Sequence, residues 1–94
     1  MFAIENPSTG KSEDKFERID DSQRDDILDR STAAYDAWRS TRIEERAAVL
    51  SRAADLYEER IDELADHIGR EMGKLTRWAK AEVQIVADIY RYYA

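Results

Sequence analysis

The sequence predicts a mainly α-helical chain, with a short β-hairpin at its start followed by three helices, of which the second and third form an antiparallel pair. Two observations predict this class. After residue 20, apolar residues recur at alternating spacings of three and four, as on one face of a helix. Before it, Pro7 and Gly10 lie in a turn-like stretch between two short segments with strand-like alternation.

The hairpin is expected within residues 1–20. The segments "FAIE" and "KFERI" place β-branched or aromatic residues at alternate positions, and "NPSTGKSED" separates them. In that turn Pro7 fixes its own φ, while Gly10 can take a positive φ. Two strands alone are marginal in water, so we expect the hairpin to pack against another part of the protein.

The first helix is expected from about Asp20 to Arg39. Ser22 and Asp25 have the spacing of a capping box, and an aspartate-rich start suits the positive end of a helix dipole. Apolar side chains then follow the helical rhythm. They are Leu28, Tyr35 and Trp38, with the small Ser31 between them.

The second helix is the strongest pattern in the chain. Thr41 and Glu44 again have capping-box spacing, and one apolar seam with charged flanks follows for about thirty residues. Gly69, late in this helix, costs about 1 kcal/mol relative to Ala, and close approach of another backbone would explain its presence. The seam consists of Ile43, Ala47, Leu50, Ala54, Tyr57, Ile61, Leu64 and Ile68.

The third helix is expected to begin after a stop at Gly73 and to run to the end of the chain. Lys74 complements the negative end of the preceding helix, and Thr76 can cap the new one. Its apolar residues cover more than one face, so we expect it to be buried on several sides. They are Trp78, Ala79, Val83, Ile85, Val86, Ile89, Tyr90, Tyr92 and Tyr93.

The composition argues against several classes of function. The 94 residues include no Cys, which excludes disulfides and thiol nucleophiles within the chain. A net charge of −6 argues against nucleic-acid binding, which needs a basic surface. No apolar run is long enough to span a membrane and no signal-peptide pattern is present, so we expect a cytoplasmic protein without a membrane partner. The aspartate-rich, lysine-poor composition suits either a high-salt cytosol or an ordinary acidic protein.

No side-chain pattern carries catalytic chemistry. The stretch "REMGKLT" lacks the glycine spacing of a phosphate-binding loop and has Leu75 where that loop has a hydroxyl residue. His67, the single histidine, is expected to be structural because metal sites usually gather more than one strong ligand. Carboxylate pairs such as Glu58 and Glu59 are typical of solvated helix faces. The side chains alone therefore predict no catalytic, cofactor-binding or metal-binding residue.

Four segments, in this order, resemble the opening part of an aldehyde dehydrogenase. They are "IENPSTGK", "AYDAWRSTRIEERAAVLSRAADLYEERIDELA", "REMGK" and "AEVQIVADIYRYYA". "EMGK" leans toward the succinate-semialdehyde dehydrogenase branch, whereas Leu75 departs from the family, which usually has Pro after Gly-Lys. The resemblance implies one segment over 1–94, with a hairpin arm over 1–20 and a helical part over 21–94. It would be the N-terminal piece of the nucleotide-binding domain in a larger α/β fold.

Members of this family oxidise an aldehyde to an acid with NAD or NADP, through a thiohemiacetal on a Cys and hydrolysis assisted by a Glu. The resemblance puts that Cys, that Glu and the nucleotide-binding motif outside the matched segment. It therefore implies a scaffold fragment that is inactive and binds no cofactor alone, with the remainder of the longer enzyme as its partner.

The resemblance also implies one candidate ion site. Many family members seat a monovalent cation between backbone carbonyls before the Asn-Pro turn and an acidic residue of the third helix. The matching positions are the carbonyls of Ile4 or Glu5 and the carboxylate of Glu82. We prefer the alternative that Glu82 pairs with an arginine or caps a strand amide, because Asp is commoner at its position in cation-binding members.

A second hypothesis treats the chain as a stand-alone helical interaction module that assembles through the seam at 43–68 and the third helix. Its motivation is surplus apolar surface, which an isolated chain hides by self-association or by binding a partner. A fragment of a larger enzyme would also be expected to form a homo-oligomer or a dimer with exchanged elements.

Overall fold

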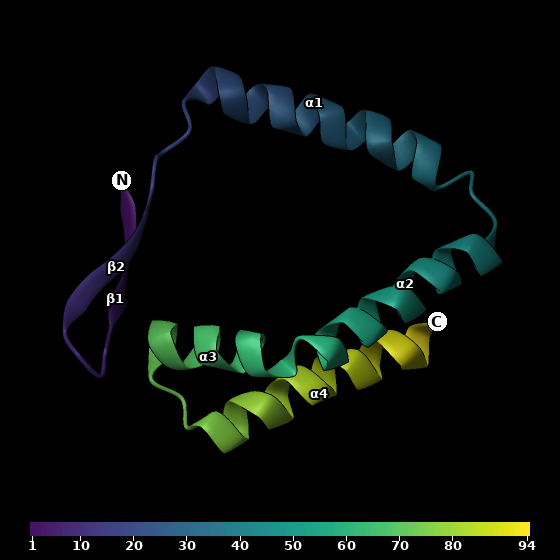
Figure 1. Ribbon diagram of the computed structural model, residues 1–94. Coiled ribbons are helices and arrows are strands. Elements are labelled where there is room, and N and C mark those ends of the chain that lie inside the picture. Colours follow the sequence, from purple (N-terminus) through teal and green to yellow (C-terminus); the bar gives the residue numbers. More distant parts are fainter.

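A hairpin and four helices make up the computed structural model, which describes residues 1–94 and is mainly helical, as the sequence predicts (Figure 1). The hairpin lies at one end of an open frame, α1 forms a separate side, and α2, α3 and α4 lie together. The elements are β1 (Phe2–Asn6), β2 (Lys11–Phe16), α1 (Asp21–Trp38), α2 (Ile43–Glu59), α3 (Ile61–Met72) and α4 (Thr76–Tyr93).

The predicted count of three helices is wrong, because the long second helix bends at Arg60. Arg60 has φ −109° and ψ 20°, yet its N–H donates to the Leu56 carbonyl and its own carbonyl accepts from Leu64. Neither Pro nor Gly marks the bend, and the apolar spacing continues through it. Periodicity identifies the buried face of a helix but does not report its straightness. Both halves contact α4, so the bend keeps one seam on that helix.

Helix α1 has a capping box, but two residues before the predicted one. The Asp20 carboxylate accepts from the Gln23 N–H at 2.8 Å, and the Gln23 side chain accepts from the Asp20 N–H at 3.0 Å. Ser22 lies inside the helix. The local sequence contains several capping residues in one turn, so spacing alone did not select the right one. The helix ends at Trp38, one residue before the predicted Arg39, which is its C-cap.

The capping roles predicted for Thr41 and Thr76 are also wrong. The Thr41 hydroxyl donates backward to the Trp38 carbonyl at 2.7 Å, so α2 begins after Arg42 without a side-chain cap. Thr76 is the first residue of α4, whose N-cap, Leu75, makes no side-chain cap bond. These helix starts are therefore specified by packing more than by capping.

The hairpin packs against α3, which confirms the expectation that it packs against another part of the protein. Its strands are antiparallel with a register shift between Ala3 and Glu5, and Gly10 has the positive φ expected of it, 67°. Gly73 ends α3 in the left-handed conformation at φ 71°, as predicted. A Cβ placed on Gly73 would lie 3.0 Å from Cγ of Pro7, so the turn of the hairpin rests on the end of α3.

Helix α4 runs antiparallel to α2, as predicted. Arg91, near its end, pairs with Asp55 and Glu58, while Lys80, near its start, pairs with Asp62 just after the bend. The core along this contact is made of small side chains, and no large side chain is fully buried. Its buried apolar residues are Ala54, Ala65, Ala79, Val83 and Ala87.

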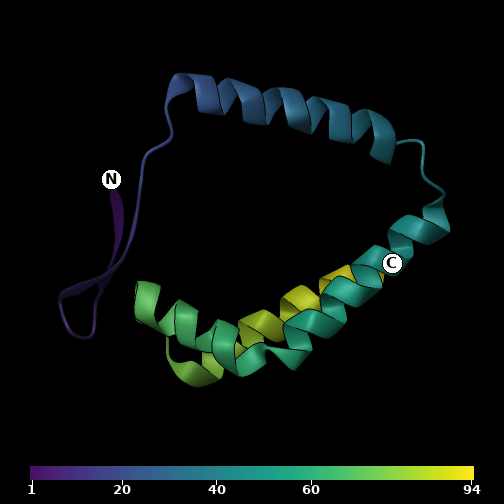
Figure 2. The same cartoon turned by 45° about the horizontal axis from the view of Figure 1, so that its top comes forward.

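The molecule is flat and open. Its extents are 47 × 37 × 14 Å and its radius of gyration is 17.2 Å, against about 12 Å for a compact domain of this length. A thickness of 14 Å is little more than one helix. The expectation that the last helix is buried on several sides is therefore wrong: α4 leaves Trp78 60% and Tyr92 82% exposed. Helix α1 contacts no other element and stands apart in both views (Figures 1 and 2). None of the helices is long and apolar enough to cross a membrane.

The two glycines at the end of α3 predict opposite effects of substitution. Gly73→Ala is expected to destabilise the fold by about 1–2 kcal/mol, because a Cβ is disfavoured at this φ and would also press on Pro7. Gly69→Ala is expected to stabilise it by about 1 kcal/mol, because an added Cβ would meet only the Lys74 carbonyl, at an ordinary 3.7 Å. Urea unfolding followed by circular dichroism measures both, and equal effects of the two variants would contradict this account.

Candidate functional site

The stretch around Gly73 and Lys74 lies between α3 and α4 and is not built to hold a phosphate. The Gly73 N–H is already used by the Gly69 carbonyl at 2.8 Å, as in a helix C-cap. The Lys74 ammonium pairs with the Glu82 carboxylate on α4. A phosphate-binding loop instead presents free N–H groups and a lysine after a strand. The stretch therefore does not fit the phosphates of a nucleotide cofactor.

A polar cavity of about 310 Å³ lies where the hairpin meets α3 and α4. Asn6, the one buried polar residue, donates from Nδ2 to Glu13 at 2.8 Å, and its Oδ1 accepts from the Ser8 N–H. Glu13 in turn forms an ion pair with Arg70 of α3, at 3.1 Å. These contacts join the hairpin to the helices through residues 57 positions apart. The cavity is lined by Asn6, Ser8, Ala65, Asp66, Gly69, Arg70, Gly73, Lys74, Leu75 and Thr76.

His67 lies between charged side chains of the same helix, α3. Its Nδ1 lies 2.9 Å from the Arg70 guanidinium, and its Nε2 lies 3.9 Å from Glu63. No three His, Asp or Glu side chains come together in a geometry that could hold a metal ion. These contacts of His67 join neighbouring turns of the same helix.

The three positions of the candidate cation site are not brought together within this chain. Ile4 and Glu5 lie on β1, Glu82 lies on α4, and these two elements do not contact one another. The Glu82 carboxylate pairs with Lys74, and not with the arginine or strand amide expected as its partner. The ion proposed there would have to be completed by groups outside the chain.

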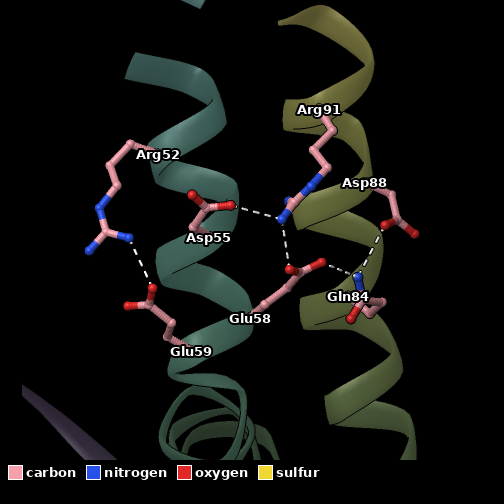
Figure 3. A network of polar contacts seen from close by, with 7 residues as sticks. All are labelled: Arg52, Asp55, Glu58, Glu59, Gln84, Asp88 and Arg91. Carbon is pink, nitrogen blue, oxygen red and sulfur yellow. Dashed lines mark hydrogen bonds and ion pairs between the residues drawn. The ribbon is translucent and has the colours of Figure 1, made fainter. Parts of the chain in front are cut away.

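A polar clasp joins α2 to α4 (Figure 3). One guanidinium nitrogen of Arg91 lies 2.9 Å from Asp55 and 2.7 Å from Glu58. Glu58 also accepts from the Gln84 amide at 2.9 Å, and Gln84 donates to Asp88 as well. At the neighbouring positions Tyr57 and Tyr90 the two rings stack, with their centroids 5.5 Å apart. The clasp pairs charges and contains no group set apart for acid–base chemistry. The sequence predicts Glu58 only as part of a solvated face, because spacing within one helix gives no signal for a partner on another.

The bend between α2 and α3 carries the one acidic group with a shifted pKa. Arg60 donates two hydrogen bonds to Glu63, at 2.9 and 2.6 Å, and these lower the pKa of Glu63 from its ordinary value. A carboxyl with a lowered folded pKa adds stability above its unfolded pKa, and that stability is lost as pH falls through the folded pKa. The shift follows from an exposed local ion pair and is not the sign of a catalytic acid.

Arg60→Gln is expected to raise the pKa of Glu63 toward its ordinary value, because the two bonds from the guanidinium are lost. Carboxyl-carbon NMR titration measures this shift directly. Arg52→Gln is the matched control, since Arg52 pairs with Glu59 and not with Glu63. An unchanged Glu63 titration in the Arg60 variant would show that the pair does not persist in solution.

Arg91→Met is expected to weaken the α2–α4 contact by about 1 kcal/mol or less at low salt, because its ion pairs are roughly half exposed. The difference from the unmodified chain should vanish near 1 M salt, where the Debye length is about 3 Å. Urea unfolding at two salt concentrations measures it. Arg77→Met is the control, because Arg77 lies over the Trp78 ring and not in the clasp. A loss that persists in high salt would assign the effect to packing of the arginine stem.

Comparison with known proteins gives one consistent result. The family model described as "Aldehyde dehydrogenase family" matches residues 1–94. The NADP(+) succinate-semialdehyde dehydrogenase of Deinococcus radiodurans is 44% identical over 92 residues, covering 98% of this chain and 19% of that protein. The NADP(+) D-glyceraldehyde dehydrogenase of Thermoplasma acidophilum is 35% identical, covering 95% of this chain and 20% of that protein.

A crystal structure of succinic semialdehyde dehydrogenase from Streptococcus pyogenes, in complex with NADP+, superposes with a TM-score of 0.91 at 31% identity. The superposition covers 98% of this chain and 20% of that one. The chain thus spans about a fifth of the length of the relatives it matches. The helices and hairpin have the arrangement found within that larger fold.

Proposed function

The chain belongs to the aldehyde dehydrogenase family, and we propose that it is the N-terminal scaffold segment of an NADP(+)-dependent enzyme that oxidises succinate semialdehyde to the corresponding acid. The observation that carries the proposal is a likeness that extends over almost the whole chain. The D. radiodurans relative aligns with 98% of it at 44% identity, and the S. pyogenes structure superposes on 98% of it.

In this proposal the chain contributes shape and not chemistry. It has no Cys to attack an aldehyde, and the stretch at Gly73 and Lys74 is occupied by its own hydrogen bond and ion pair. The cofactor and the aldehyde are then bound by residues outside the chain. What the chain offers is a flat frame with apolar side chains exposed on α4, which suits a segment that other parts of an enzyme pack against.

The names of the relatives support the choice of substrate and cofactor. Succinate semialdehyde is named for the relative at 44% identity and for the superposed structure, and D-glyceraldehyde for one at 35%. NADP is named for all three. Succinate semialdehyde with NADP is therefore the leading choice, and D-glyceraldehyde is the second.

A graft tests the scaffold role. The matched segment of the D. radiodurans enzyme is replaced by residues 1–94, and reduction of NADP by succinate semialdehyde is followed by absorbance. The graft is expected to keep kcat within about tenfold of the parent, because the segment positions no reacting group. The 94-residue chain by itself is expected to reduce no NADP with either aldehyde.

A second graft that carries the S. pyogenes segment is the matched control. If that graft is active and the graft of this chain is soluble but inactive, the scaffold role is wrong. Activity of the isolated chain would instead contradict the proposal that the reacting groups lie outside it.

A further inference from the structure

Helix α4 is apolar around more of its circumference than its own chain covers. It contacts α2 and α3 and no other element, and the residues buried there are Ala79, Val83 and Ala87. Val86 and Tyr90, which lie next to them around the helix, are half-buried. A helix whose apolar surface extends past its buried face needs a partner on a further side.

Four large apolar side chains form that further side of α4. Trp78 is 60% exposed, Ile85 57%, Ile89 52% and Tyr92 82%. Because an α-helix turns about 100° per residue, the spacing of these positions places all four within about 60° of one another. We call these four residues the α4 outer face. It adjoins the half-buried side chains, so it continues the apolar contact that α4 already makes with α2 and α3.

The charged groups beside the α4 outer face are engaged within the chain. At one edge the Glu82 carboxylate pairs with Lys74, and at the other edge Asp88 belongs to the polar clasp. The guanidinium of Arg77 lies over the Trp78 ring, 5.8 Å from its centroid. The face is thus apolar at its centre and polar at its edges, as a packing interface is. A surface that meets it has to present apolar side chains.

The chain has no second layer of its own to lay on this face. The molecule is 14 Å thick, little more than one helix, whereas a domain is built from two or three packed layers. The S. pyogenes structure superposes on 98% of this chain, yet the matched part is 20% of that protein. About four-fifths of such an enzyme therefore lies outside the matched part and can supply the missing layer.

We propose that the α4 outer face is the surface on which the rest of the enzyme, the part outside these 94 residues, packs as a second layer. The inference rests on the proposed function and adds to it the face and the chemistry of the contact. An apolar surface of the rest of the enzyme lies across the four side chains, while α2 and α3 hold α4 from its other side. A second copy of this chain is the competing occupant.

Cysteine labelling provides the first test. Ile89→Cys is made in the 94-residue chain, which has no Cys of its own, and in the graft of residues 1–94 into the D. radiodurans enzyme. Reaction with a maleimide is followed by the mass of the peptide that carries position 89, so other cysteines of the graft do not interfere. The labelling rate is expected to fall about tenfold or more from the chain to the graft, because a covered thiol is shielded from the reagent.

Asp88→Cys is the matched control for the labelling. It is the next position on the same helix, is also exposed, and lies about 100° around the helix toward the polar clasp. Its labelling rate is expected to be the same in the chain and in the graft.

Three results of the labelling would overturn the proposal. Equal rates for Ile89→Cys in the chain and in the graft would show that nothing packs on the face. Equal protection of positions 88 and 89 in the graft would show that the cover is not specific to the outer face. Protection of position 89 already in the isolated chain would assign the face to a second copy.

The double variant Ile85→Lys, Ile89→Lys provides the second test. Lysine is a good helix former, and both positions lie largely in water, so the urea midpoint of the isolated chain is expected to stay unchanged. In the graft the yield of soluble enzyme is expected to drop about tenfold or more, because two ammonium groups would be buried without partners. A weakened isolated chain, or a graft with undiminished yield, would overturn the proposal.

The two tests also separate this inference from the scaffold role. Activity of the unmodified graft reports on the scaffold role, whereas labelling and yield report on the outer face. A soluble graft that is inactive but protects position 89 would contradict the scaffold role and support the docking face. An active graft that leaves position 89 open to the maleimide would do the reverse.

Discussion

Helix α4 lies along both α2 and α3, and the small side chains on its buried face allow the three backbones to approach one another closely. Ala54, Ala79 and Ala87 have no exposed surface, and Val83 has 3%. Because α3 is held in place by this contact, its end presents Gly73 to Pro7 and Arg70 to Glu13. The hairpin is thus positioned through α3 by helix α4, which has no contact of its own with the strands.

A seam made of alanines has an energetic consequence. Each side chain buries little area, and apolar burial stabilises by only about 25 cal/mol per Å². Several of the larger apolar side chains lie outside the seam, among them Trp78, Ile85 and Ile89 on α4. In a layer 14 Å thick there is no second layer to receive them. The same geometry that makes the chain a poor independent domain makes it a suitable frame for other surfaces to cover.

Much of this arrangement could be predicted from the sequence, and several of the failures share a cause. The helical class, the end of α1 at Trp38, the stop at Gly73 and the antiparallel pair follow from local spacing and backbone preferences. The bend at Arg60 has no Pro or Gly to mark it. The contact of Pro7 with Gly73 depends instead on residues far apart in sequence. So do the two polar links, Arg70 with Glu13 and Arg91 with Glu58. Periodicity identifies which face of a helix is apolar, but it carries no information on which partner that face meets.

The polar clasp fixes the register between α2 and α4, which the alanine seam alone leaves undetermined. Ala79, Val83 and Ala87 are spaced four apart, so sliding α4 by one turn along α2 would again bury small side chains. That slide would move Arg91 about 5 Å away from Asp55 and Glu58, and would carry Tyr90 off the ring of Tyr57. Half-exposed ion pairs add little to stability, yet they separate one register from the next, because the slid arrangement leaves their charges without partners. The clasp therefore acts through specificity: it selects which of several similar seams forms, and with it the placing of α3 and of the hairpin.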